Sequence, residues 1–300
     1  MRAIRMKVIV SLTRGRLGVL ATFAILCALV TVPIASVLAN ELDTTAAAGQ
    51  PGQVFYTTSD AGNGAEIFAI NVQGGTVTVR DVGPTNGGDC VSLALSASGK
   101  LYSMCGPLFG TQQLATIDTR TGQADLFGAP VSGLAVMALS FGRNGNLYAV
   151  GDCNPDNNFE CTRGSDPNYN SLYRVDMHSG AFARVGSTGA PQFFMDLALG
   201  PNGQMFGVTS TDNPSTVPAS LYRINVQSGE AQQHRVLFGS NSIMGLAFGQ
   251  DDKLYATDFT QNSRLYAIDL KTGFETTIAA LPFGFSSGLE LLNSEDERQP

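Results

Sequence analysis

The sequence predicts an all-β protein, a five-bladed β-propeller with four strands in each blade. At five places an Asp or Asn is followed four residues later by a Gly, and neighbouring glycines lie 47, 58, 49 and 44 residues apart. This spacing fits a propeller, because known blade repeats are about 40–50 residues long. No stretch beyond the N-terminal segment has the period of an amphipathic helix. The five pairs are Asn71 and Gly75, Asp118 and Gly122, Asp176 and Gly180, Asn225 and Gly229, and Asp269 and Gly273.

Residues 1–39 have the pattern of a signal peptide. Five Lys and Arg residues precede or begin an uncharged run over residues 17–39, which ends in Val37-Leu38-Ala39. We expect cleavage after Ala39 and a secreted or periplasmic protein, with an uncleaved membrane anchor as the alternative. We assign residues 40–52 to a linker, residues 53–292 to the propeller and residues 293–300 to a disordered tail.

The chain that remains after cleavage is strongly acidic. It keeps 13 of the 18 Lys and Arg residues against 25 Asp and Glu residues, a net charge of −12. Such a chain is repelled by nucleic acids and by anionic membrane surfaces, so we expect neither as a partner. Its length suits a single repeat-built domain, which we expect to be a monomer.

Four segments align without gaps as inner strands, and each is followed by a tight turn and a second strand. The turns contain Ser98-Gly99, Asn144-Gly145, Asn202-Gly203 or Asp251-Asp252, and the Gly-containing ones accept the positive φ angles of tight hairpins. Small residues alternate with large ones, as expected beside a crowded central axis. The segments are Leu93–Ser96, Leu139–Gly142, Leu197–Gly200 and Leu246–Gly249.

The first and last segments complement each other. The first unit begins at Gln53 with a second strand and therefore lacks an inner strand. The segment Ser287–Leu292 matches an inner strand and has no blade of its own. Pairing the two would close the ring and hide two sheet edges. We therefore expect the C-terminal strand to complete the first blade.

Four cysteines remain after cleavage, an even number that indicates disulfides in an exported chain. If Leu95 and Lys100 flank the turn of their hairpin, Cys90 lies directly opposite Cys105 and within disulfide reach. Cys153 and Cys161 then remain and would close a small loop.

Acidic residues gather where inner strands begin and where second strands end. Converging carboxylates would suit Ca²⁺, which takes 6–8 oxygen ligands, although Asp is also common in polar loops. Asp196 and Glu290 stand where the other inner strands carry small residues, and their alignment places both on one face of the strand. A carboxylate there must be solvated by channel water, paired or metal-bound. The metal-ligand candidates are Asp196, Glu290, Asp152 and Asp258, and the ligand-binding candidates are Asp60, Asp89, Asp156 and Asp212.

The longest insertion covers residues 151–170 and surrounds Cys153 and Cys161. Its Asp152-x-Asn154-x-Asp156 pattern is similar to the start of a calcium-binding loop. Pro155 and Arg163 depart from the EF-hand pattern. We expect a disulfide-stapled surface loop that binds Ca²⁺ weakly or contacts a partner.

Blade motifs such as Leu265-Tyr266-Ala267-Ile268-Asp269-Leu270-Lys271-Thr272-Gly273 resemble those of exported bacterial propellers. These in turn are similar to quinoprotein-like, NHL-like and gluconolactonase-like propellers. The resemblance covers residues 53–292 and implies the fold, because its motifs form hairpins and carry no catalytic group.

We identify no catalytic residue. His178 is expected in a hairpin tip and His234 on an outer strand, away from any triad or zinc site. The sequence therefore favours a noncatalytic module that binds a protein or a small ligand at the channel mouth. The alternative is a metal-dependent hydrolase or lactonase at the acidic mouth, as a resemblance to gluconolactonase-like propellers implies. The lack of Trp argues against a quinone-dependent dehydrogenase.

Overall fold

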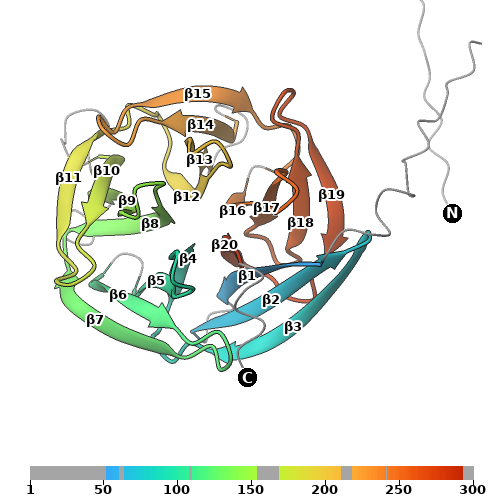
Figure 1. The fold of residues 1–300 in the computed structure, drawn as a ribbon, viewed down its shortest axis with the longest axis horizontal. Helices are drawn as coiled ribbons and strands as arrows, with labels where there is room; N and C mark the ends of the chain where they lie inside the picture. Colours follow the sequence, from blue (N-terminus) through green and yellow to red (C-terminus); the bar gives the residue numbers. More distant parts are fainter. Residues whose placement is uncertain are drawn as a thin grey trace, which may run out of the picture. The chain divides into compact units, whose positions relative to one another are not determined.

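The computed structural model describes residues 52–60, 64–107, 110–153, 169–210, 218–240 and 242–292. In this part of the chain, twenty strands form five antiparallel sheets of four strands each. The sheets are the blades of a ring, with one strand of each near the axis and one on the rim (Figure 1). The predicted all-β five-bladed propeller is confirmed. The described residues include no helix that could cross a membrane.

The strands of each blade follow one another from the axis outward. Blade 1 contains β20 (Ser286–Leu291), β1 (Gln53–Asp60), β2 (Ala65–Gln73) and β3 (Thr76–Pro84). Blade 2 contains β4 (Cys90–Leu95), β5 (Leu101–Cys105), β6 (Gln112–Ile117) and β7 (Ala124–Val131). Blade 3 contains β8 (Leu134–Phe141), β9 (Leu147–Cys153), β10 (Ser171–Val175) and β11 (Phe182–Ser187). Blade 4 contains β12 (Phe194–Leu199), β13 (Met205–Thr209), β14 (Ser220–Ile224) and β15 (Ala231–Val236). Blade 5 contains β16 (Ile243–Phe248), β17 (Leu254–Asp258), β18 (Arg264–Ile268) and β19 (Glu275–Ala280).

The repeated Asp-to-Gly hairpin forms in four of the five blades. In blade 3 the Asp176 carboxylate accepts hydrogen bonds from the amides of His178 and Ser179, and Gly180 N donates to Asp176 O. The side chain thus copies a backbone turn, and Gly180 supplies the positive φ that closes it. Asp118, Asn225 and Asp269 form the same turn in blades 2, 4 and 5.

The prediction was wrong for blade 1. Gln73 pairs with Thr76 around the shorter turn Gly74-Gly75, so Asn71 stays within strand β2 and caps nothing. Two consecutive glycines favour this shorter turn, because both can adopt a positive φ.

The hairpin glycines also allow neighbouring blades to touch. A Cβ atom at Gly122 would overlap the backbone of Gly83 on the preceding blade, and one at Gly229 would overlap the backbone of Gly186. Gly180 and Gly273 meet the preceding blade in the same way. A Cβ atom at Gly75 would meet no such atom within 4 Å. The repeated glycine therefore serves inter-blade packing as well as turn geometry.

The C-terminal strand completes blade 1, as predicted. Strand β20 pairs antiparallel with β1, and Leu292 N donates to Val54 O just beyond the strand. The hydroxyl of Thr57 contacts Ser286 Oγ and Gly288 O at 2.6 Å each. Two segments more than 220 residues apart thus form one sheet.

The core lies between adjacent blades. The leucine of every inner strand is completely buried, and each such side chain stabilises the fold by about 1.5–3 kcal/mol. The inner-strand leucines are Leu93, Leu139, Leu197, Leu246 and Leu289.

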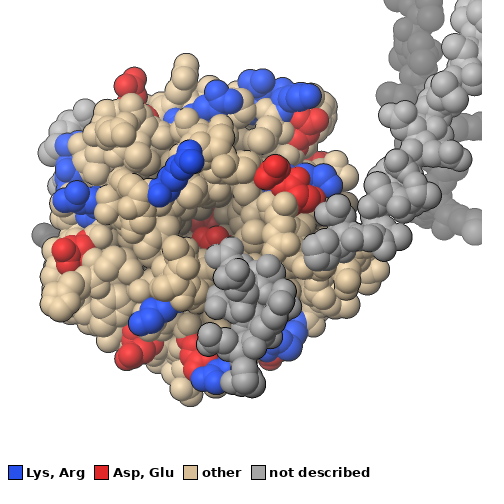
Figure 2. Space-filling model, in the orientation of Figure 1, with Lys and Arg blue, Asp and Glu red and all other residues tan. Residues whose placement is uncertain are grey.

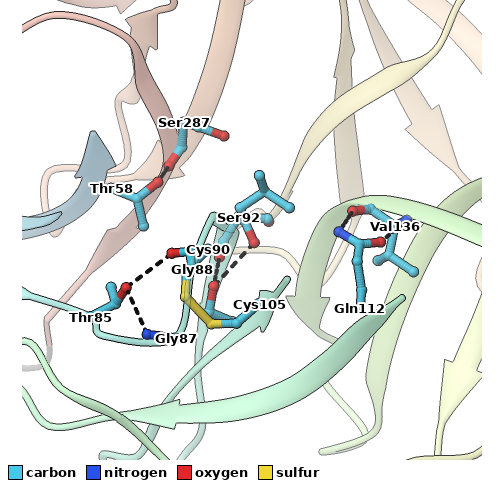
Figure 3. Close-up of a disulfide and its surroundings, with 12 residues drawn as sticks. Thr58, Thr85, Gly87, Gly88, Cys90, Ser92, Cys105, Gln112, Val136 and Ser287 are labelled. Atoms are coloured by element: carbon cyan, nitrogen blue, oxygen red, sulfur yellow. Dashed lines mark hydrogen bonds between the residues drawn. A yellow bond between two sulfur atoms is a disulfide. The ribbon is translucent and has the colours of Figure 1, made fainter. Parts of the chain in front are cut away.

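Blade 2 contains the predicted disulfide between Cys90 and Cys105, with a Cα–Cα distance of 4.0 Å (Figure 3). The turn is one residue longer than the sequence suggested, because Leu95 pairs with Leu101 and not with Lys100. A register shift between Val91 and Ala94 restores the pairing of the cysteines. The predicted Cys153–Cys161 disulfide lies outside the described residues.

Candidate functional site

The carboxylate of Asp196, on inner strand β12, connects three further inner strands. Its Oδ2 accepts hydrogen bonds from Leu246 N of β16 at 2.8 Å and from Leu289 N of β20 at 3.1 Å. Its Oδ1 accepts from Ser92 Oγ of β4 at 2.8 Å and from Leu197 N at 3.0 Å. The inner edge of each sheet has no further strand to pair with, so the amides on that edge need other acceptors. The Asp196 carboxylate is the acceptor for the amides of Leu246 and Leu289.

Ser92 extends the network to the fifth inner strand. Its Oγ accepts a hydrogen bond from Leu139 N of β8 at 2.8 Å while it donates to Asp196. The backbone of Ser92 has a φ of 54°, and Ser103 Oγ donates to its carbonyl oxygen at 2.9 Å. Two side chains therefore join all five blades at the axis.

Asp196 has no exposed surface. Burial raises its pKa well above the usual value, while the four hydrogen bonds act in the opposite direction. Both carboxylate oxygens are hydrogen-bonded in the structure. No group of three or more His, Cys, Asp and Glu side chains in the described ranges could hold a metal ion. Calcium binding stays a prediction.

Asp196 belongs to a buried layer at the axis. The residues at this position of the other inner strands are also buried. We call the hollow beside the first residues of the inner strands the upper hollow, and the one beside their last residues the lower hollow. The other residues of the buried layer are Ser92, Ala138, Gly245 and Gly288.

Glu290 lies in the next layer toward the lower hollow and is partly exposed. The carboxylate accepts a hydrogen bond from Leu291 N at 3.2 Å, and burial raises the pKa of Glu290 to about 8. Figure 2 shows acidic atoms inside the central hollow of the face drawn there. The other inner strands carry small residues in this layer, namely Ala94, Ser140, Ala198 and Ala247.

The two other metal-ligand candidates hold loops of their own blades. Asp258, only 2% exposed, accepts hydrogen bonds from Arg264 N at 2.7 Å and from Tyr266 Oη at 2.8 Å. Asp152 accepts one from Asn170 N at 3.3 Å, across the base of the long insertion. Both carboxylates lie at the end of a second strand and bind a backbone amide just before or at the start of the third strand, that of Asn170 or Arg264.

The remaining candidates are scattered. Asp89 is partly buried in the loop before β4, and Asp60 ends β1 with a side chain outside the described set. Asp156 and Asp212 also lie outside the described residues. His178 is exposed in a hairpin tip, and His234 of β15 lies against the ring of Phe206 with centroids 5.8 Å apart. Both histidines occupy the predicted elements.

Sequence analysis missed a layer of methionines beside the upper hollow. Met137, Met195 and Met244 stand two positions before the inner-strand leucine in three consecutive blades. All three are partly exposed. The repeated spacing from Met to Leu is visible in the aligned inner strands, but the spacing alone does not indicate a site.

A second missed feature is an aromatic pair on the rim. Phe238 follows β15 of blade 4, and Phe274 precedes β19 of blade 5. Each is 60% exposed, and the ring centroids lie 5.4 Å apart. Arg235 Nε donates to Lys271 O at 2.6 Å, which fastens the two segments together.

Four clefts in the described surface contain none of the acidic candidates. They have volumes of about 740, 750, 650 and 380 Å³ and lie beside hairpins of blades 2, 4, 1 and 3. Since they recur with the blade, they follow from its shape and mark no individual site.

A family described as "Repeat of unknown function (DUF6923)" matches residues 55–276. No curated protein matches the sequence. A chain from the crystal structure of a nidogen–laminin complex has a TM-score of 0.50 at 10% identity, covering 81% of this chain and 99% of its own. A putative 6-phosphogluconolactonase from Bacteroides fragilis has a TM-score of 0.48 at 12% identity, covering 81% and 98%. Virginiamycin B lyase from Staphylococcus aureus has a TM-score of 0.41 at 16% identity, covering 77% and 71%. At these identities the likenesses show the fold alone.

Proposed function

Since the chain belongs to the repeat family DUF6923, we propose that it is a noncatalytic propeller module that binds another protein through its rim. The N-terminal pattern of cations followed by an uncharged run supports a location outside the cytoplasm. The binding surface that we propose is the part of the rim around the aromatic pair of Phe238 and Phe274, where blades 4 and 5 meet.

The exposure of this pair carries the proposal. Two aromatic rings that are each 60% exposed leave apolar area in water, and aromatic residues dominate the binding energy of protein interfaces. The blade does not require an aromatic residue at the position of Phe274. The hairpins of the other blades carry Thr76, Gln123, Ala181 and Glu230 there, all exposed.

The two rings are held in place before any partner arrives. Ser240 N donates to Glu275 Oε2 at 2.5 Å, and Arg235 Nε donates to Lys271 O on the other side of the pair. Because both flanking segments are fixed, little conformational entropy would be lost on binding. The nidogen–laminin structure supports the proposal only in that a propeller of this shape occurs in a protein complex.

Site-specific photocrosslinking in the full chain tests the proposal. A photoreactive phenylalanine analogue placed at position 238 or at position 274 should crosslink to one and the same protein in the producing cell. The analogue at Glu230, the matching hairpin position of blade 4, should not capture that protein. Excess wild-type chain should compete for the crosslink, whereas a Phe238→Ser, Phe274→Ser chain should not. Equal capture from position 230, or equal competition by the double variant, would contradict the proposal.

A further inference from the structure

The three methionines beside the upper hollow are the extra residues of three β-bulges. The register of β8, β12 and β16 with their second strands leaves Met137, Met195 and Met244 unpaired. A bulge redirects the side chain of its extra residue. The residues on both sides of each methionine are buried, yet each methionine keeps some exposure.

The apolar core does not account for these residues. The other described methionines, Met104, Met177 and Met205, pack into apolar clusters between the blades. The bulge methionines belong to none of the five clusters. Their sulfur atoms are therefore available to something other than the core.

The layer that holds the methionines lies next to the buried layer of Asp196. Strand β12 packs against both β8 and β16, so the three methionines stand at the same position of three adjacent inner strands. In β20 the same alignment position is Ser287, shown with Thr58 in Figure 3. Ser287 is 2% exposed, and its Oγ has no hydrogen-bond partner. Strand β20 therefore supplies no thioether at this level, and its unpaired residue is Gly288 and not Ser287.

We propose that the upper hollow binds one soft monovalent metal ion, Cu(I) or Ag(I), through the thioether sulfurs of Met137, Met195 and Met244. Thioethers favour Cu(I), whereas Ca²⁺ and Mg²⁺ take oxygen ligands. A thioether carries no proton that the metal must displace, so the ligands themselves release no proton when the metal binds. A site made of histidine or cysteine would lose affinity as the pH falls.

Titration of the full chain with Cu(I) under anaerobic conditions, against a chromophoric Cu(I) chelator, tests this site. We expect one Cu(I) per chain and X-ray absorption spectra with sulfur as the nearest neighbour of the metal. Ag(I) serves as an air-stable second probe. Each single substitution Met137→Leu, Met195→Leu or Met244→Leu should weaken binding by about 10- to 100-fold. Leucine nearly conserves the side-chain volume, so the fold should be retained.

Met177→Leu is the matched control, because Met177 is a partly buried methionine on a hairpin of blade 3. It should bind Cu(I) like the wild type. The proposal is overturned if the wild type binds no Cu(I), if the three single variants bind as tightly as the wild type, or if Met177→Leu loses as much affinity as they do.

Discussion

Ser92 donates a hydrogen bond to Asp196 across 2.8 Å, although the two residues lie 104 positions apart in the sequence. Through this bond and the amides that surround it, a single buried carboxylate holds the inner strands of the ring together. The position that the sequence marked as a metal ligand thus has a structural task, and its substitution should affect the whole fold.

Asp196→Asn should destabilise the protein. An amide side chain cannot accept hydrogen bonds at both of its ends, so at least one buried amide among Leu197, Leu246 and Leu289 loses its partner. Each loss costs about 1–3 kcal/mol. Denaturant unfolding of the variant against the wild type measures this cost. Equal or greater stability of the variant would show that the carboxylate is not the acceptor that the structure indicates.

Protonation of Glu290 should make the fold more stable. Its pKa is raised from 4.5 to about 8 in the folded state, so the folded protein holds this proton more tightly than the unfolded chain does. The contribution of this bound proton to the unfolding free energy is fully present below about pH 4.5 and is lost as the pH rises through about 8. As the pH rises from about 4.5 to about 8, the unfolding free energy of the wild type should therefore fall relative to that of Glu290→Gln. A difference independent of pH would contradict the burial of this group.

Gly122→Ala should cost more stability than Gly75→Ala. Both glycines have a φ near +80°, which costs a residue with a side chain about 1–2 kcal/mol. Only the Cβ at position 122 would overlap the preceding blade, at the backbone of Gly83, which adds about 1–3 kcal/mol. Thermal unfolding of both variants separates the two contributions. Similar melting temperatures would show that the blades do not touch at this glycine.

Deletion of residues 287–300 should open the ring. It removes most of β20, exposes the inner edge of β1 and leaves Asp196 without the amide of Leu289. We expect aggregation or a large fall in melting temperature, measured by light scattering and calorimetry. Deletion of residues 293–300 alone keeps β20 and Leu292 and should leave both measurements unchanged. A monodisperse 287–300 deletion with normal melting would contradict closure by β20.

Peptide mapping without reduction should identify the Cys90–Cys105 link. The bonded residues are 15 positions apart, and a loop of this length stabilises the fold by about 3 kcal/mol. Replacing both cysteines by serine should therefore lower the unfolding free energy by about that amount. The same map tests the predicted Cys153–Cys161 link. A peptide joining Cys90 to Cys153 or Cys161 would show a different arrangement in solution.

The repeat predicted the fold class because hairpin chemistry is local. A side chain that accepts backbone amides and a Gly with positive φ form the same turn in four of the five blades, so Asp176 and Gly180 could be interpreted from sequence. The closure by Ser286–Leu291 was equally predictable, since an unpaired edge strand needs a partner.

The register was harder to predict, because bulges leave no local signal. The sequence paired Leu95 with Lys100, whereas the structure pairs it with Leu101. A bulge at Ser92 offsets the longer turn, so the predicted cysteine pair was right although the predicted turn was not. Bulges one position earlier in the aligned inner strands leave the methionines unpaired, and these too could not be predicted from the sequence. Asp196 was recognised as unusual, but its partners lie on other blades and could not be identified from one sequence.

The pairing of β20 with β1 makes the order of synthesis relevant to folding. Strand β20 follows all the other strands in the chain, so a ribosome releases it after blades 2 to 5 are complete. Until then β1 has no inner neighbour and Asp196 lacks the amide of Leu289. Contacts between such distant segments form slowly, because a long loop must close first. Blades 2 to 5 can therefore fold during translation, whereas the ring and its central carboxylate are completed only after the C-terminal segment has emerged.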